Sequence, residues 1–290
     1  YERVGVNAVK TGYVADGGGI QRIDEKGVET FEWHDGQFMA NHHLNVVKSA
    51  AKRKIAINPH EPIKDTGLRR TYPNWVAREG ARGQEYNAWG VPPIPPEHDV
   101  IIPFTRLLSG PMDFTPGIFD LRPNERPPVN AELGRNSKAS RVETTLAKQL
   151  ALYVTVYSPI QMAADLPQNY EKRMDAFQFI KDVPTDWEET IGVAAEIGDY
   201  AAIARKERGG ADWYLGAITD ENARKLSLPL DFLDEGKTYV AEIYRDGKRA
   251  DYDKNPYDIV IEKREMTSAD TLTLALGRSG GAAVRFRAKS

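Results

Sequence analysis

The chain has 290 residues, which suits two ordinary domains better than one small module. Its composition, with 41% hydrophobic and 28% charged residues, is that of a globular protein and argues against a disordered chain, a collagen or a coiled coil. A net charge of -3 argues against a general nucleic-acid binder, and the lack of cysteine excludes disulfides, thiolate metal sites and a cysteine nucleophile.

The start of the chain predicts that more of the fold lies upstream. The sequence opens with Tyr1, without a methionine or an apolar signal segment, and enters a strand-like run at once. Because a parallel strand needs partners on both sides, we expect the sequence to begin inside a larger fold. No window approaches ~18 apolar residues, so no membrane span is predicted.

Strand and helix patterns alternate through residues 1–184. A buried strand over 4–14, a helix over 37–54 and a strand over 54–58 predict one βαβ unit. Further strands are predicted at 75–77, 112–114 and 160–164, and further helices at 99–108, 140–156 and 167–181. Repeated βα units of this size indicate the later part of an α/β (β/α)8 barrel, because a complete barrel takes ~250 residues. We therefore expect the N-terminal part of that barrel to lie upstream of this sequence.

Residues 185–290 have a different sequence pattern, in which apolar and polar residues alternate over short segments. Strands are predicted at 193–197, 201–205, 213–218, 238–244 and 271–276. Turn signals separate them at 209–210, 246–247 and 280–281. The pattern predicts a small antiparallel β-sandwich domain. Trp213 and Tyr214 are predicted to lie in its core, and stacking on a sugar is the alternative for this aromatic pair.

The densest group of chemically active side chains follows the strand at 54–58. His60 and Glu61 come directly after it, at the end of a strand where barrels carry catalytic groups. With Glu79 and Glu85 they offer carboxylates that bind a hard cation, divide acid and base roles, or do both. The alternative is that these glutamates pair with four nearby arginines in structural ion pairs, which the sequence pattern alone favours. Composition and spacing leave these alternatives open.

The segments 60–61, 66–74, 78–83, 85–86, 103–106 and 110–117, with a weaker match at 9–13, form a specific pattern. It resembles glycoside hydrolase family 97, a family of bacterial α-glucosidases and α-galactosidases. The resemblance implies the later half of a catalytic barrel followed by a small C-terminal β-sandwich. It also implies a large N-terminal β-sandwich and the first half of the barrel in complete members, and a periplasmic or secreted location.

The resemblance implies roles for individual residues. Glu85 matches the general acid that protonates the departing glycosidic oxygen. Glu61 matches the general base of the inverting branch and a calcium ligand, and Glu79 matches a second calcium ligand. Glu85 is itself close to or on the metal in this pattern. His60 matches a substrate-binding histidine, and Lys10 is a weaker match to a sugar-hydroxyl contact.

The branch of the family follows from one position. Retaining members use an aspartate nucleophile on the strand that here reads 10–13, and Gly12 stands at that position. Retention needs carboxyl groups ~5 to 5.5 Å apart, whereas inversion leaves ~6.5 to 9.5 Å for a water. Gly12 with Glu61 therefore fits inversion, which the family links to α-glucosides. The resemblance implies that a second base glutamate and a further calcium ligand belong to family segments upstream of Tyr1, so we expect residues 1–290 alone to be inactive.

The predicted function is thus calcium-dependent, inverting hydrolysis of terminal α-glucosidic bonds in oligosaccharides. A retaining α-galactosidase of the same family and a non-catalytic carbohydrate-binding protein are the alternatives. Asp113, at the end of a predicted strand, fits a sugar contact or a structural hydrogen bond. The loop residues Trp33 and Trp89 are conceivable sugar platforms.

Overall fold

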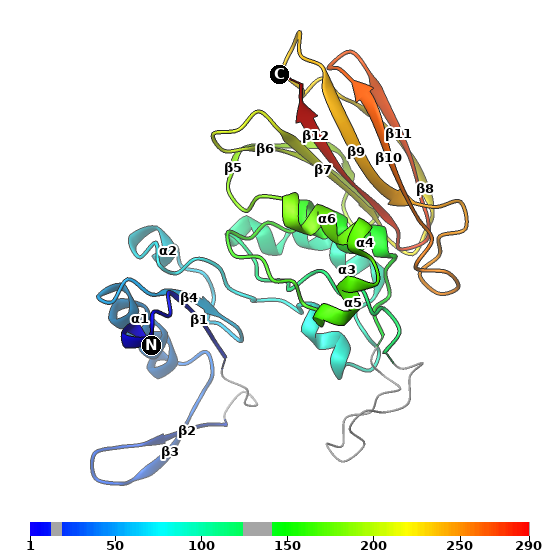
Figure 1. Ribbon diagram of the computed structural model, residues 1–290. Coiled ribbons are helices and arrows are strands. Elements are labelled where there is room, and N and C mark those ends of the chain that lie inside the picture. Colours follow the sequence, from blue (N-terminus) through cyan, green and yellow to red (C-terminus); the bar gives the residue numbers. More distant parts are fainter. Residues whose placement is uncertain (13–18, 124–140, 290) are drawn as a thin grey trace. The chain divides into compact units, whose positions relative to one another are not determined.

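The computed structural model describes residues 1–12, 19–123 and 141–289 (Figure 1). The predicted end of the first strand at 13–14 and the predicted helix start at 140 lie outside these residues. The described chain forms two compact units. The first contains Tyr1–Arg82, Leu108–Asp113 and Ser158–Ile160, and the second contains Gly83–Leu107, Phe114–Tyr157 and Gln161–Ser290. The predicted domain boundary between residues 184 and 185 stays a prediction.

The first unit is built on a βαβ motif. Strands β1 (Ala8–Thr11) and β4 (Ala56–Pro59) pair in parallel, and helix α1 (Gln37–Ala51) joins them in sequence. The buried face of α1 packs with the two strands in a small hydrophobic cluster, formed by Val9, Val46, Ala50, Ile55 and Ile57. The predicted βαβ unit is therefore present, although its first strand is shorter than residues 4–14.

Two further segments extend this parallel arrangement. The backbone N–H of Glu79 donates to the Pro59 carbonyl at 3.0 Å, and that of Asp113 donates to the Arg78 carbonyl at 3.1 Å. Regular pairing is limited to isolated bridges, so the strands predicted at 75–77 and 112–114 are present as single bridge pairs. Four chain segments consequently run parallel in the order β1, β4, 74–79 and 112–113.

A β-hairpin interrupts the motif between β1 and α1. Its strands, β2 (Ile20–Ile23) and β3 (Glu29–Glu32), pair antiparallel. Both strands are largely exposed, with Ile23 at 65% and Phe31 at 67%, so their sequences carry no alternation of buried and exposed residues. This is why sequence patterning did not reveal them. The unit also contains the short helix α2 (Leu68–Thr71) and a 3-10 turn at Glu2–Val4.

The second unit contains a six-stranded antiparallel sheet with the order β10-β9-β12-β7-β6-β5. Its strands are β5 (Trp187–Glu196), β6 (Tyr200–Glu207), β7 (Trp213–Thr219), β9 (Tyr239–Asp246), β10 (Ile259–Met266) and β12 (Gly281–Ala288). A second sheet, β8 (Arg224–Pro229) with β11 (Thr271–Leu276), shares one hydrophobic core with it. The core includes Trp213, as predicted.

Helix α4 (Leu146–Thr155) packs on β7 and β12, and all ten of its residues are buried (Figure 1). Glycine permits this contact, because a Cβ on Gly216 would lie 2.7 Å from the Ala151 carbonyl oxygen. The remaining helical segments of the unit are η2 (Gln84–Ala88), α3 (Pro96–Ile101), η3 (Ile102–Phe104), α5 (Pro167–Glu171) and α6 (Met174–Asp182). A further 3-10 turn covers Arg106–Ser109.

The strand predicted at 160–164 is wrong, because residues 160–164 are irregular and none of them is fully buried. The backbone groups of this segment form hydrogen bonds with side chains and with another loop. The Tyr153 hydroxyl donates to the Met162 carbonyl at 2.6 Å, and the Ala164 N–H donates to the Pro116 carbonyl at 3.2 Å. The helix predicted at 167–181 is divided into α5 and α6 at Arg173, whose backbone leaves the helical region. Among the described helices, none has the length and apolar character required to cross a bilayer.

Candidate active site

Polar side chains gather at the carboxyl ends of the four parallel segments of the first unit. Gly12 follows β1, and His60 and Glu61 follow β4. Glu79 ends the third segment and Asp113 ends the fourth. Because parallel segments end at the same edge, these five residues from distant parts of the sequence share one site. Such edges are where open and closed α/β folds bind ligands.

His60 lies between two carboxylates. Its side chain is buried, with Nε2 at 2.8 Å from Asp113 Oδ2 and Nδ1 at 3.3 Å from Glu79 Oε2. Burial opposes the charge of the imidazole, but hydrogen bonding to Asp113 and Glu79 outweighs it and raises the pKa of His60 to about 9. At neutral pH the ring is therefore an imidazolium, which donates through Nε2 to Asp113 and forms an ion pair with Glu79. A direct contact between His60 and substrate stays a prediction.

Asp113 fixes the position of the His60 ring. The residue is fully buried, and its Oδ2 accepts both the His60 ring and the Asn58 amide, the latter at 2.6 Å. One carboxylate oxygen thus ties the fourth segment to two residues at the end of β4. The geometry favours the structural hydrogen bond over the sugar contact for Asp113.

Glu61 has an unusual backbone and an unusual side chain. Its φ angle of 43° lies in the left-handed region, which costs a residue with a side chain ~1 kcal/mol. Its Oε2 atom is buried and has no hydrogen-bond partner among the described residues. Strain and an unsatisfied buried carboxylate oxygen are features that cluster at functional sites.

Gly12 and Glu61 occupy adjoining space. A Cβ atom on Gly12 would lie 2.8 Å from Glu61 Oε2, closer than such contacts occur in proteins. Any side chain at position 12 would therefore displace the Glu61 carboxylate. In this geometry the site accommodates either the Glu61 carboxylate, which follows β4, or a side chain at position 12, which follows β1, but not both.

The nearby arginines bond to an aspartate that sequence analysis did not single out. Arg69 Nε lies 3.1 Å from Asp65 Oδ2, and Arg78 Nη1 lies 3.6 Å from Asp65 Oδ1. The Arg78 guanidinium also stacks on the Trp75 ring at 4.0 Å. For these two arginines, the structural ion pairs considered from the sequence form with Asp65.

The other two predicted site residues are placed as follows. Lys10 lies on β1, opposite Asn58 of β4, and its side chain is exposed. Glu85 belongs to the second unit, where it is exposed in the first turn of η2. Their predicted roles in sugar contact and acid catalysis stay predictions. Of the two tryptophans, Trp33 is 62% exposed and Trp89 is 55% exposed.

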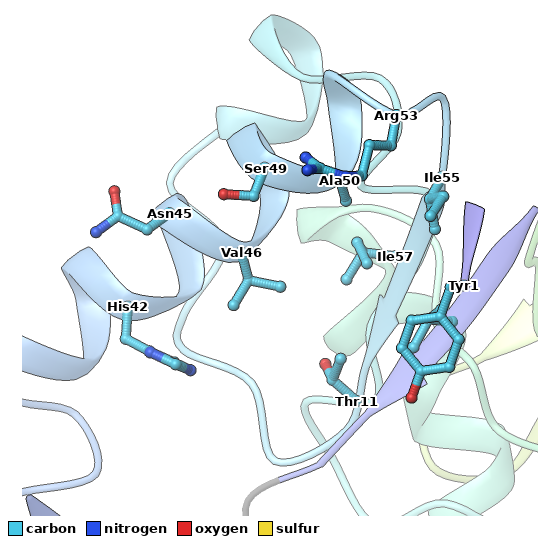
Figure 2. A pocket seen from close by; sticks show the side chains of 11 residues that line it. Tyr1, Thr11, His42, Asn45, Val46, Ser49, Ala50, Arg53, Ile55 and Ile57 are labelled. Carbon is cyan, nitrogen blue, oxygen red and sulfur yellow. The ribbon is translucent and has the colours of Figure 1, made fainter. Parts of the chain in front are cut away.

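A cavity of about 620 Å³ lies elsewhere in the first unit. Val46 of α1 and Arg53, which follows the helix, line it together with Val9 and Ile57 from the strands (Figure 2). None of the predicted catalytic side chains reaches it. The cavity is therefore a space between helix and strands rather than the site at the strand ends.

Two protein-family models match parts of the chain. Residues 1–81 match the family model described as glycoside hydrolase 97, and residues 186–287 match the model described as glycosyl-hydrolase 97 C-terminal, oligomerisation. The chain belongs to glycoside hydrolase family 97.

Individual relatives cover nearly all of the chain. A retaining alpha-galactosidase of Bacteroides thetaiotaomicron is 33% identical over 270 residues, which are 91% of this chain and 39% of that protein. A probable retaining alpha-galactosidase of Streptomyces bingchenggensis is 29% identical over 280 residues, 97% of this chain and 36% of that protein. The chain thus spans less than half the length of these relatives.

Solved structures give a more similar match. A glycoside hydrolase family 97 enzyme from Pseudoalteromonas, solved in complex with panose and with acarbose, is 61% identical. Its TM-score is 0.93 over 100% of this chain and 43% of that chain. A beta-arabinopyranosidase shares the fold at 23% identity and a TM-score of 0.72, over 98% of this chain and 40% of that chain.

Proposed function

We propose that the chain carries the later part of a (β/α)8 catalytic barrel and the C-terminal domain of an inverting α-glucosidase. This enzyme would remove terminal α-linked glucose from oligosaccharides. The observation that carries the proposal is the pair Gly12 and Glu61, in which a carboxylate fills the space that a side chain at position 12 would need. Membership of the family supports hydrolysis of glycosidic bonds as the reaction class. A periplasmic or secreted location of the enzyme is proposed on the same basis.

The proposed chemistry uses two carboxyl groups. Glu61 takes a proton from a water molecule, whose oxygen attacks the anomeric carbon on the face opposite the leaving group. Glu85 gives its proton to the glycosidic oxygen as the carbon–oxygen bond breaks. One bond forms while the other breaks, so the anomeric configuration inverts. The His60 imidazolium, held by Asp113 and Glu79, keeps a fixed positive charge at the same edge.

The retaining α-galactosidase is the second candidate, because both curated relatives carry that name. Retention requires a carboxylate nucleophile, and Gly12 offers none at the position that the resemblance assigns to it. The 61% identical enzyme was solved with panose and acarbose, which supports glucosides as substrates of this chain.

Substrate preference separates the two candidates. For the protein expressed from its complete gene, kcat/KM for maltose is expected to exceed that for melibiose by more than ~100-fold, since a site built around one hydroxyl configuration rejects the other. Steady-state kinetics on both disaccharides measures this ratio. A preference for melibiose would support the galactosidase, and binding of maltose without turnover would support a carbohydrate-binding protein.

We further propose that Glu61, Glu79 and Glu85 hold calcium. The buried Glu61 Oε2 fits this ion, because it lacks a hydrogen-bond donor among the described residues and carboxylate oxygens are the ligands that calcium prefers. Bound calcium would favour the ionised form of Glu61, which its role as a base requires.

Glu79→Gln is expected to weaken calcium binding at least ~10-fold, because the amide is neutral and a poorer ligand. Titration calorimetry measures the affinity, and calcium should raise the melting temperature of the wild type after treatment with EGTA. Glu235→Gln, at an exposed turn of the C-terminal domain, is the matched control. Equal calcium affinity in the wild type and Glu79→Gln would remove Glu79 from the metal site.

A further inference from the structure

Gln149 is a buried hub of hydrogen bonds in α4. Its Oε1 accepts from the backbone N–H groups of Gly117 and Ile118, at 3.0 and 3.2 Å, and from Gln84 Nε2 at 3.2 Å. Its Nε2 donates to Thr144 Oγ1 at 3.0 Å. The side chain is completely buried, so each of these groups depends on it for a partner.

One of these bonds leads directly to the proposed acid. Gln84 precedes Glu85 at the start of η2, and its backbone N–H also donates to the Phe114 carbonyl at 2.8 Å. At the other end of η2, the buried Asn87 accepts the Ile94 N–H at 2.8 Å. The exposed Glu85 therefore lies between two buried amide side chains that fix the ends of its turn.

A short 3-10 helix needs such external support. Segments of this length have little stability of their own, because they close few backbone hydrogen bonds. Helix α4 provides a rigid base, since all of its residues are buried and it packs on β7 and β12. The link from α4 to η2 runs through Gln149 and Gln84.

We infer that Gln149 is a positioning residue for Glu85, acting through Gln84 to hold the carboxyl group in the direction required for proton transfer. The inference rests on the proposed function, in which Glu85 is the general acid. A displacement of ~1 Å at a catalytic group costs ~10²-fold in rate. Loss of the Gln149 acceptor should thus lower the stability of the second unit and impair protonation of the leaving group, while it leaves the action of the base unchanged.

The test measures kcat on two substrates, maltose and α-glucosyl fluoride, for variants of the protein expressed from its complete gene. The glucose leaving group of maltose requires protonation of the glycosidic oxygen. The fluoride ion of α-glucosyl fluoride is a good leaving group and departs with little help from an acid. Gln149→Met is expected to lower kcat on maltose by ~10- to 100-fold and kcat on the fluoride by less than ~3-fold. Gln149→Glu, which keeps an acceptor oxygen for the same donors, should restore most of the maltose activity.

A second variant tests whether Gln149 acts on Glu85 through Gln84. Gln84→Met should show the same selective loss on maltose, and the double variant with Gln149→Met should be no worse than Gln149→Met alone, because both remove one shared interaction. Thr155→Val is the control. Thr155 is equally buried in α4 and donates to the Ala151 carbonyl at 3.3 Å, away from η2.

Equal losses on the two substrates, or additive losses in the double variant, would overturn the positioning role even if the wild type is an α-glucosidase. If the wild type instead cleaves melibiose and α-galactosyl fluoride, the proposed specificity fails, and the same comparison on that pair decides the role of Gln149. A wild type inactive on both sugars would overturn the proposed function and this inference together.

Discussion

Glu61→Gln is expected to lower kcat on maltose by ~10²- to 10⁴-fold with little change in KM, because an amide cannot take the proton from the attacking water. After treatment with EGTA the folded state should be as stable as the wild type, since Glu61 Oε2 makes no hydrogen bond among the described residues. Steady-state kinetics and thermal melts of the protein expressed from its complete gene measure both quantities. A variant with more than ~10% of wild-type kcat would contradict the role of Glu61 as base.

Azide distinguishes a base from an acid at this position. In Glu61→Ala, azide can replace the activated water, because it needs no base to attack. With α-glucosyl fluoride as substrate, the expected product is β-glucosyl azide, formed on the face opposite the departing fluoride. An α-azide product would place Glu61 on the leaving-group side and exchange the proposed roles of the two glutamates.

Gly12→Ala tests the steric relation between positions 12 and 61. The methyl group would lie 2.8 Å from Glu61 Oε2 and displace the carboxylate, so kcat should fall by ~10- to 100-fold. Stability should change little, because the contact falls on the end of a flexible side chain. Gly192→Ala in β5 is the matched control, since a Cβ there meets nothing within 4 Å. Wild-type kcat in Gly12→Ala would show that the observed Glu61 position is not the working one.

Lys148→Met is expected to destabilise the second unit by about 3–5 kcal/mol, because it leaves a buried carboxylate without its counter-charge. Lys148 and Asp99 are both almost completely buried, with Nζ at 3.1 Å from Oδ2. Nζ also donates to the carbonyls of Pro96 and Thr219, both at 3.1 Å, and to Ser279 Oγ at 3.2 Å. A single ammonium group therefore joins α4, the start of α3 and the six-stranded sheet.

Denaturant titration monitored by circular dichroism measures this loss. Lys206→Met is the control, because the Lys206–Asp234 pair is partly exposed, at 23% and 24%, and such pairs contribute ~1 kcal/mol or less. The double variant Lys148→Met with Asp99→Asn should recover part of the stability, since it removes the buried charge that the single variant leaves unpaired. Equal destabilisation by Lys148→Met and Lys206→Met would contradict this account of the buried pair.

Local patterns predicted much of the fold. The helical period of α1 and the apolar run of β4 depend on neighbouring residues, and both elements are present near their predicted positions. The strand β8 was missed although Leu226 and Leu228 alternate with polar residues, which was a readable signal. The strands β10 and β12 were also missed. In β12 several buried positions are alanine or glycine, which carry little strand preference.

The site was predicted only as far as it follows strand ends. His60 and Glu61 were singled out in this way, Glu79 was named as a glutamate that converges on them, and the structure brings all three to one edge of the first unit. The bond between His60 and Asp113 joins residues 53 positions apart, so only the folded chain reveals it. Gln149 was missed because a glutamine in a helix normally indicates an exposed face, whereas α4 is buried on all sides.

The most direct test of the proposed inverting mechanism is the anomer that the enzyme releases first. Proton NMR during the first minutes of α-glucoside hydrolysis, before mutarotation equilibrates the product, distinguishes α-glucose from β-glucose. We expect β-glucose, because water activated by Glu61 attacks the face opposite the leaving group. Initial release of α-glucose would contradict inversion and would require a nucleophile that Gly12 does not provide.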